Sequence, residues 1–125
     1  MSGAVLDQMV LKRGDTLPVF QRILKFDNGD VQDLTSSTEI NFVYRIENGG
    51  VPDPDTAAVV VSCSIVNAPG TDGLVSVAFA ASDTDVVADY LGEFEVKFGT
   101  DRLSFPNGKG KWIRFCVVQD AGDAP

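Results

Sequence analysis

Four stretches of the chain alternate between apolar and polar residues, as strands with one buried face do. These stretches are residues 39–47, 57–66, 74–80 and 90–98. In the first of them, Ile40, Phe42 and Tyr44 share one face, and Asn41 lies on the other. A period of two over this length predicts a half-buried strand, so we expect each of the four stretches to form one.

Two further segments are apolar on both faces, residues 17–26 and 111–118. A strand in a sheet with one solvated face does not need a second apolar face. Either loops and termini cover that face, or it forms a docking surface for another subunit, and the sequence leaves both explanations open. The interface candidates on these segments are Val19, Ile23, Phe26, Trp112 and Phe115.

Gly, Pro, Asn and Asp separate the apolar runs at short intervals, which is typical of an all-β domain. The dipeptide Asn28-Gly29 predicts a tight hairpin turn with two positive-φ residues, so residues 31–34 should fold back on the strand before them. Residues 48–55 are rich in glycine and proline, and we expect a surface loop without a regular ladder. A cap-like run of Ser, Asp and Thr predicts the one helical turn, over residues 84–89.

The number and spacing of these segments predict the fold class. About seven to nine short strands must each bury one face, and two stacked sheets are the simplest way to do so. The sequence therefore predicts an all-β, antiparallel β-sandwich with at most one short helical turn. No repeat or linker divides the chain, so we expect one domain over residues 1–118 and a mobile acidic tail over residues 119–125.

Charge narrows the range of partners. The chain has 18 acidic and 10 basic residues, for a formal net charge of -8. Such a surface repels the phosphates of nucleic acids and anionic lipids, so neither is an expected partner. The N-terminal residues lack the basic and apolar regions of a signal peptide, which predicts synthesis in the cytoplasm.

The residue types that most enzymes depend on are missing or poorly placed. The chain has no histidine, which excludes histidine-based triads, dyads and metal sites. The carboxylate pairs Asp83 with Asp85 and Glu93 with Glu95 are two residues apart on predicted exposed segments, where solvation is the simpler interpretation. Loop aspartates do not form a calcium-loop motif. We therefore expect no catalytic activity, no cofactor and no specific metal site.

Two smaller features have structural interpretations. Cys63 and Cys116 are expected to be small core hydrophobes, with an inter-sheet disulfide as the alternative. The tripeptide Arg13-Gly14-Asp15 also occurs in adhesive ligands. Here Gly14 more simply provides the backbone angles of a corner between strands.

A series of short motifs resembles one known family. In chain order they are residues 12–16 (KRGDT), an apolar strand with an Asn-Gly turn, residues 31–35 (VQDLT), residues 40–45 (INFVYR), Asp83-Thr84, residues 92–96 (GEFEV) and Phe105-Pro106. Together they resemble the N-terminal domain of phage baseplate upper proteins, over residues 9–118. The motifs are short and consist largely of turn residues.

The resemblance implies an immunoglobulin-like sandwich in a phage tail tip or baseplate, where copies form rings. It predicts a virion structural protein made in the host cytoplasm, with copies of itself and other virion proteins as partners. The family continues into a linker and a C-terminal arm that the present sequence does not contain, so the expectation extends to a tail, neck or capsid-decorating subunit. A second hypothesis is a module that binds host glycans through the rings of Trp112, Tyr90 or Tyr44.

Overall fold

The computed structural model describes residues 8–17, 19–106, 110–119 and 121, and over these the protein is all-β with one short helical turn. Most of the predicted mobile tail lies outside the described residues. The elements are β1 (Gln8–Lys12), β2 (Phe20–Ile23), β3 (Glu39–Asn48), β4 (Val51–Pro52), β5 (Val59–Ile65), β6 (Leu74–Val77), η2 (Ala81–Thr84), β7 (Ala88–Phe98), β8 (Asp101–Phe105) and β9 (Ile113–Val118).

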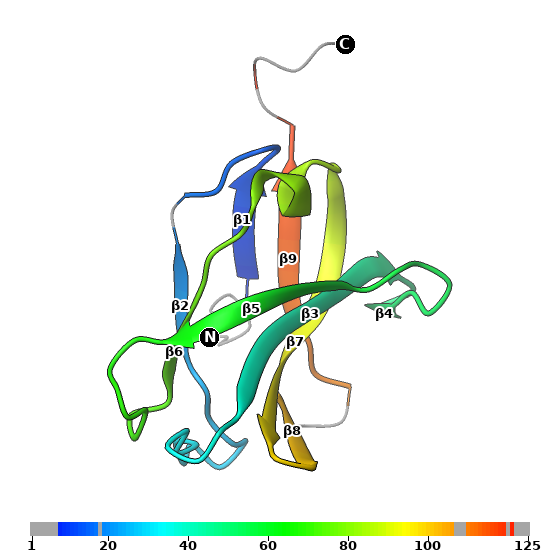
Figure 1. Ribbon diagram of the computed structural model, residues 1–125. Helices are drawn as coiled ribbons and strands as arrows, with labels where there is room; N and C mark the ends of the chain where they lie inside the picture. Colours follow the sequence, from blue (N-terminus) through cyan, green and yellow to red (C-terminus); the bar gives the residue numbers. More distant parts are fainter. Residues whose placement is uncertain (1–7, 18, 107–109, 120, 122–125) are drawn as a thin grey trace.

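The described strands form one mixed sheet in the order β1-β9-β7-β3-β5-β6-β2, with β4 paired to β3 and β8 paired to β7. β5 crosses between its two neighbours, because residues 59–62 pair with β3 whereas residues 63–65 pair with β6. This crossing curls the sheet until it is nearly barrel-shaped (Figure 1). The all-β prediction is confirmed, whereas the strands form one curled sheet in which β5 belongs to both halves.

One strand pairing departs from the expected antiparallel sheet. β1 runs parallel to β9, with Met9 beside Phe115 and Leu11 beside Val117. Met9 and Leu11 point into the core, so the parallel register buries the apolar face of β1. Alternation within a strand does not specify the direction of its partner, and for this reason the sequence did not predict the pairing.

The inner face of the curled sheet holds an aromatic core. Phe79 and Phe115 stack with centroids 4.7 Å apart, and Tyr44 meets Phe115 edge-on at 4.9 Å. Phe42 and Phe94 lie opposite each other on β3 and β7, and their rings are 5.0 Å apart. On the predicted apolar face of residues 39–47, Ile40, Phe42 and Tyr44 are therefore confirmed as core, whereas Ile46 near the end of the strand is 37% exposed. Packing of the buried rings stabilises the fold.

A glycine on β7 makes room for this core. Gly92 lies opposite Tyr44, and a Cβ at this position would approach the carbonyl oxygen of Val43 to 2.7 Å and the ring of Phe42 to 2.9 Å. Backbone cannot give way as a flexible side chain can. The glycine therefore allows β3 and β7 to pair closely under the ring of Tyr44.

The predicted two-residue turn at Asn28-Gly29 is wrong in type. Only Gly29 has positive φ, and the amides of Gly29 and Phe26 donate to the carbonyls of Phe26 and Asp30. This is a three-residue turn, in which the Asn28 side chain accepts from the amide of Asp30. Residues 31–34 return beside the strand only through an isolated bridge between Lys25 and Val31.

Two other local predictions also need correction. The helical turn is η2, over Ala81–Thr84, and not residues 84–89, because the Asp83 carboxylate accepts from the amide of Ala80 and so caps an earlier turn. The expected loop at residues 48–55 contains β4. Its Val51 and Pro52 pair with the end of β3, at an edge where the missing amide proton of proline is tolerated.

Arg13-Gly14-Asp15 forms the predicted corner after β1. Gly14 has a φ of 81°, and its amide donates to the carbonyl of Thr84 at 2.9 Å. The Thr84 hydroxyl donates to the carbonyl of Asp15 at 3.0 Å, and Arg13 Nε donates to the carbonyl of Asp85 at 2.9 Å. The tripeptide thus ties the end of β1 to η2.

The cysteines are free thiols, Cys116 buried and Cys63 half-buried. Strands β3 and β7 lie between them in the sheet order, so the alternative disulfide is not formed. Burial raises the pKa of the Cys63 thiol to about 12, which keeps it protonated and unreactive. Among the described residues there is no helix long and apolar enough to span a membrane.

Candidate functional site

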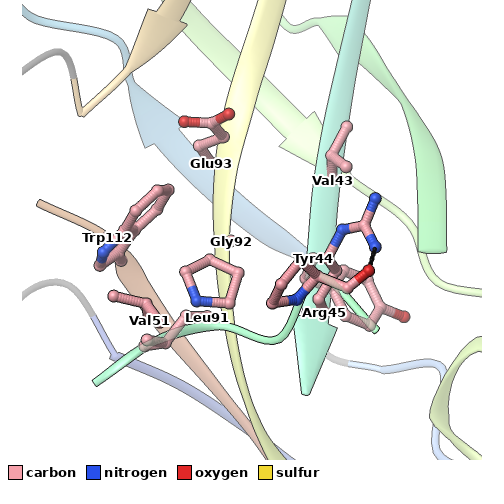
Figure 2. Close-up of a pocket in the computed structure, with 10 residues that line it drawn as sticks. Val43, Tyr44, Arg45, Val51, Leu91, Gly92, Glu93 and Trp112 are labelled. Atoms are coloured by element: carbon pink, nitrogen blue, oxygen red, sulfur yellow. Dashed lines mark hydrogen bonds between the residues drawn. The ribbon is translucent and has the colours of Figure 1, made fainter. Parts of the chain in front are cut away.

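The outer face of the sheet carries a groove above β9, β7 and β3 (Figure 2). Its volume is about 380 Å³, which is in the range of small-ligand sites. Trp112 lies at one end of the groove, beside Val51 of β4, and Arg45 lies at the other end. The groove is lined by Val43, Tyr44, Arg45, Val51, Pro52, Pro54, Leu91, Gly92, Glu93 and Trp112.

Strand alternation places the floor of the groove on the outer face. Val43 pairs with Glu93, and Arg45 pairs with Leu91, while Tyr44 between them points into the core. Val43 and Leu91 are apolar residues on faces that are otherwise polar. These two apolar residues on polar faces are the feature of the sequence from which the groove could have been predicted.

Trp112 immediately precedes β9 and is half-buried beside the groove. Its indole Nε1 is shielded from solvent and has no hydrogen-bond partner in the part of the chain that the structure describes. A buried donor without an acceptor costs on the order of 1–3 kcal/mol.

Glu93 contributes a carboxylate to the groove. Burial raises the pKa of the Glu93 carboxyl, and the charge of Glu95 raises it further, whereas Arg102 lowers it. Arg102 lies 3.6 Å from the Glu95 carboxylate and pairs with that residue. Within the described ranges no cation lies within ion-pair distance of Glu93, so Arg102 acts on this partly desolvated carboxylate only from farther away.

Arg45 holds the opposite wall of the groove. Figure 2 shows Arg45 across the groove from Trp112. Its guanidinium donates to the carbonyls of Thr56 and Pro54. These bonds attach the hairpin loop to β3. The arginine therefore shapes the groove and does not neutralise the glutamate.

A second surface lies on the outer side of β2 and β6. Ile23 pairs with Leu74, and the amide of Val66 donates to the carbonyl of Leu74. Val19 precedes β2, and its side chain is 42% exposed, the same fraction as that of Ile23. We call Val19, Ile23, Val66 and Leu74 the outer-face patch.

The predicted interface residues are divided between surface and core. Val19 and Ile23 are exposed in the outer-face patch, and Trp112 lines the groove. Phe26 packs on the core, with its ring 5.4 Å from that of Phe105. Phe115 has no exposed surface, so its prediction as an interface residue is wrong: it lies on the inward face of β9 and stacks in the aromatic core.

The structure also shows where the predicted glycan-stacking tyrosines and the metal-ligating side chains lie. Tyr44 and Tyr90 are buried and donate their hydroxyls to the carbonyls of Asp83 and Val86, so neither ring is available for stacking with a glycan. The described residues contain no group of three or more metal-ligating side chains.

Comparison with protein-family models, with curated proteins and with solved structures finds no match for this chain.

Proposed function

We propose that this protein is a non-catalytic structural subunit of a bacteriophage particle, placed in the tail, baseplate or neck and acting through contacts with its own copies and with other virion proteins. The observation that supports this most is the outer-face patch. Apolar side chains are gathered there beside β2, which is hydrogen-bonded to β6 on one side only among the described strands. An open edge with adjacent apolar surface is a template for association.

The distribution of charge supports contact through this region. Residues 8–26 contain four basic residues and one acidic residue, whereas the rest of the chain contains six basic and 17 acidic residues. Two acidic copies repel each other over most of their surfaces, so association favours the least acidic region. The outer-face patch adjoins that region through Val19 and Ile23.

We also propose that the fold is a curled variant of the immunoglobulin-like sandwich that the motifs imply. The change of partners along β5, from β3 to β6, supports this idea, since a strand that switches between sheets joins the two layers of a sandwich at a corner. Capsid decoration is a related role that would use the same kind of contact.

Protein identification in purified particles tests this role. Phage particles from a host whose phage encodes this chain are purified on a density gradient, and tails are separated from heads. We expect the chain in the tail fraction at a fixed copy number, and recovery with the heads would favour decoration. Its absence from both fractions, while it is abundant in the lysate, would contradict a structural role.

A further inference from the structure

The groove combines the Glu93 carboxylate with an aromatic ring and apolar walls, whereas the outer-face patch is apolar only. We infer that the groove binds a lysine or arginine side chain carried by an extended apolar segment of a partner protein. The groove lies above β9, β7 and β3, whereas the patch lies at β2, at one end of the sheet order. The inference is therefore separate from the proposed role in assembly and can fail or hold independently of it.

Glu93 carries a negative charge in the groove without an ion pair to a described residue. The Glu93 carboxylate is half-buried in the groove, and no described cation is close enough to pair with it. Glu95, two residues along the same face, has Arg102 at 3.6 Å. A carboxylate in this setting gains most from a partner that brings a positive charge and N–H donors, as lysine and arginine do.

The second argument is the shape and polarity of the walls. The side chains of Val43, Leu91, Val51 and Pro52 present apolar surface on which the methylene stem of a long basic side chain can pack. The ring of Trp112 stands beside Glu93, where a cation near the carboxylate also lies near an aromatic ring. The groove thus offers an apolar surface for the methylene stem, a carboxylate for the charged end and an aromatic ring beside it.

The third argument is the charge of the whole molecule. A net charge of -8 draws basic partners toward the surface and slows the approach of anionic ones. A neutral sugar would also stack on Trp112, but it would leave the charge of Glu93 unmatched. The groove therefore fits a basic polypeptide segment better than it fits a neutral glycan.

Trp112 is the only tryptophan in the chain, so its fluorescence reports directly on the groove. The probe is a capped pentapeptide with a central lysine, flanked by valines and ending in glycines. Two control probes replace the lysine with norleucine, which keeps the stem without the charge, and with glutamate. Chitotriose serves as the neutral sugar. Each is titrated against the full chain and against Glu93→Gln and Glu95→Gln variants.

We expect the lysine peptide to shift the Trp112 emission saturably, and the norleucine and glutamate peptides to bind at least about tenfold more weakly, as loss of a charge-assisted hydrogen bond predicts. Glu93→Gln should weaken lysine-peptide binding by a similar factor, and Glu95→Gln should leave it unchanged. Thermal melts of both variants verify that they are folded.

Three results would overturn the inference. One is an unchanged emission with the lysine peptide up to millimolar concentration. Another is equal affinity for the lysine and norleucine peptides, which would make the groove merely apolar. The third is saturable binding of chitotriose without binding of the lysine peptide, which would assign the groove to a glycan.

Discussion

The two faces of the β3–β7 pair are built from the same strands and have opposite properties. On the inner face, Phe42, Tyr44 and Phe94 are almost completely buried among other rings. On the outer face, Val43 and Glu93 line a groove, and the glutamate forms no ion pair with a described residue. Residues adjacent in sequence thus contribute to stability on one side and are available for binding on the other, so substitutions on the two faces should have separable effects.

The largest effect is expected from the inner face of β9. Phe115→Ala should lower the free energy of unfolding by about 3–5 kcal/mol, because it leaves a cavity among Tyr44, Phe79 and Tyr90. Denaturant unfolding followed by circular dichroism measures the loss. Arg114→Ala, on the outer face of the same strand, is the control and should cost less than about 1 kcal/mol, since it removes an exposed ion pair with Asp89 and a polar contact with Cys116. Similar losses in the two variants would contradict the contrast between faces.

A smaller but still clear loss is expected when a side chain is added where the two strands approach most closely. Gly92→Ala places a methyl group 2.7 Å from the carbonyl oxygen of Val43, and we expect a loss of about 1–3 kcal/mol. Lys97→Ala, farther along β7 on the outer face, should change stability by less than about 0.5 kcal/mol. A neutral Gly92→Ala would mean that the sheet relaxes here without cost.

The buried hydroxyl of Tyr44 should contribute about as much as one hydrogen bond. It donates to the carbonyl of Asp83 at 2.8 Å and so ties β3 to η2. Tyr44→Phe keeps the ring and should cost about 1 kcal/mol, because the carbonyl loses its partner. Thermal unfolding detects this as a lower Tm, and an unchanged Tm would show that water replaces the hydroxyl.

The smallest effect concerns Glu93 and depends on pH. Since its folded-state pKa is raised, the folded protein is favoured by this group below the unfolded pKa, and that advantage is lost as the pH rises through the folded pKa. Glu93→Gln should therefore be slightly more stable than the natural chain at pH 7, by less than about 1 kcal/mol. The difference should shrink toward pH 4. A difference that does not change between these two pH values would contradict the desolvated position of the carboxylate.

Alternation predicted the inner face well, because a strand with one buried side leaves its period in the sequence. Residues 39–47 and 90–98 contain several of the core rings, Phe42, Tyr44, Tyr90 and Phe94, and the structure confirms that these are buried. The parallel pairing of β1 with β9 and the shared strand β5 were not predicted, because they depend on contacts between residues far apart in sequence. The helical turn and the hairpin turn differ from the prediction, because single side-chain hydrogen bonds determine where they begin and end. One example is the bond that the amide of Ala80 donates to the Asp83 carboxylate.

The surfaces were predicted only in part. Val19 and Ile23 were expected at the surface because residues 17–26 are apolar on both faces, and the structure exposes both, but Phe115 was assigned to the wrong face of its strand. The doubly apolar composition of residues 111–118 hid which side faces inward. The groove was missed because it needs Trp112, β4 and the outer residues of β3 and β7 to meet in three dimensions.

The proposal that the molecule acts by assembly is tested most directly by its mass in solution as a function of concentration. Light scattering of the natural chain should give a multiple of 13.3 kDa that is reached as the concentration rises. Ile23→Lys, in the outer-face patch, should return the mass to that of one chain, whereas Val86→Lys, at a still more exposed apolar residue elsewhere, should not. A natural chain that stays at 13.3 kDa at every concentration, or an assembly indifferent to Ile23→Lys, would contradict self-association through the outer-face patch.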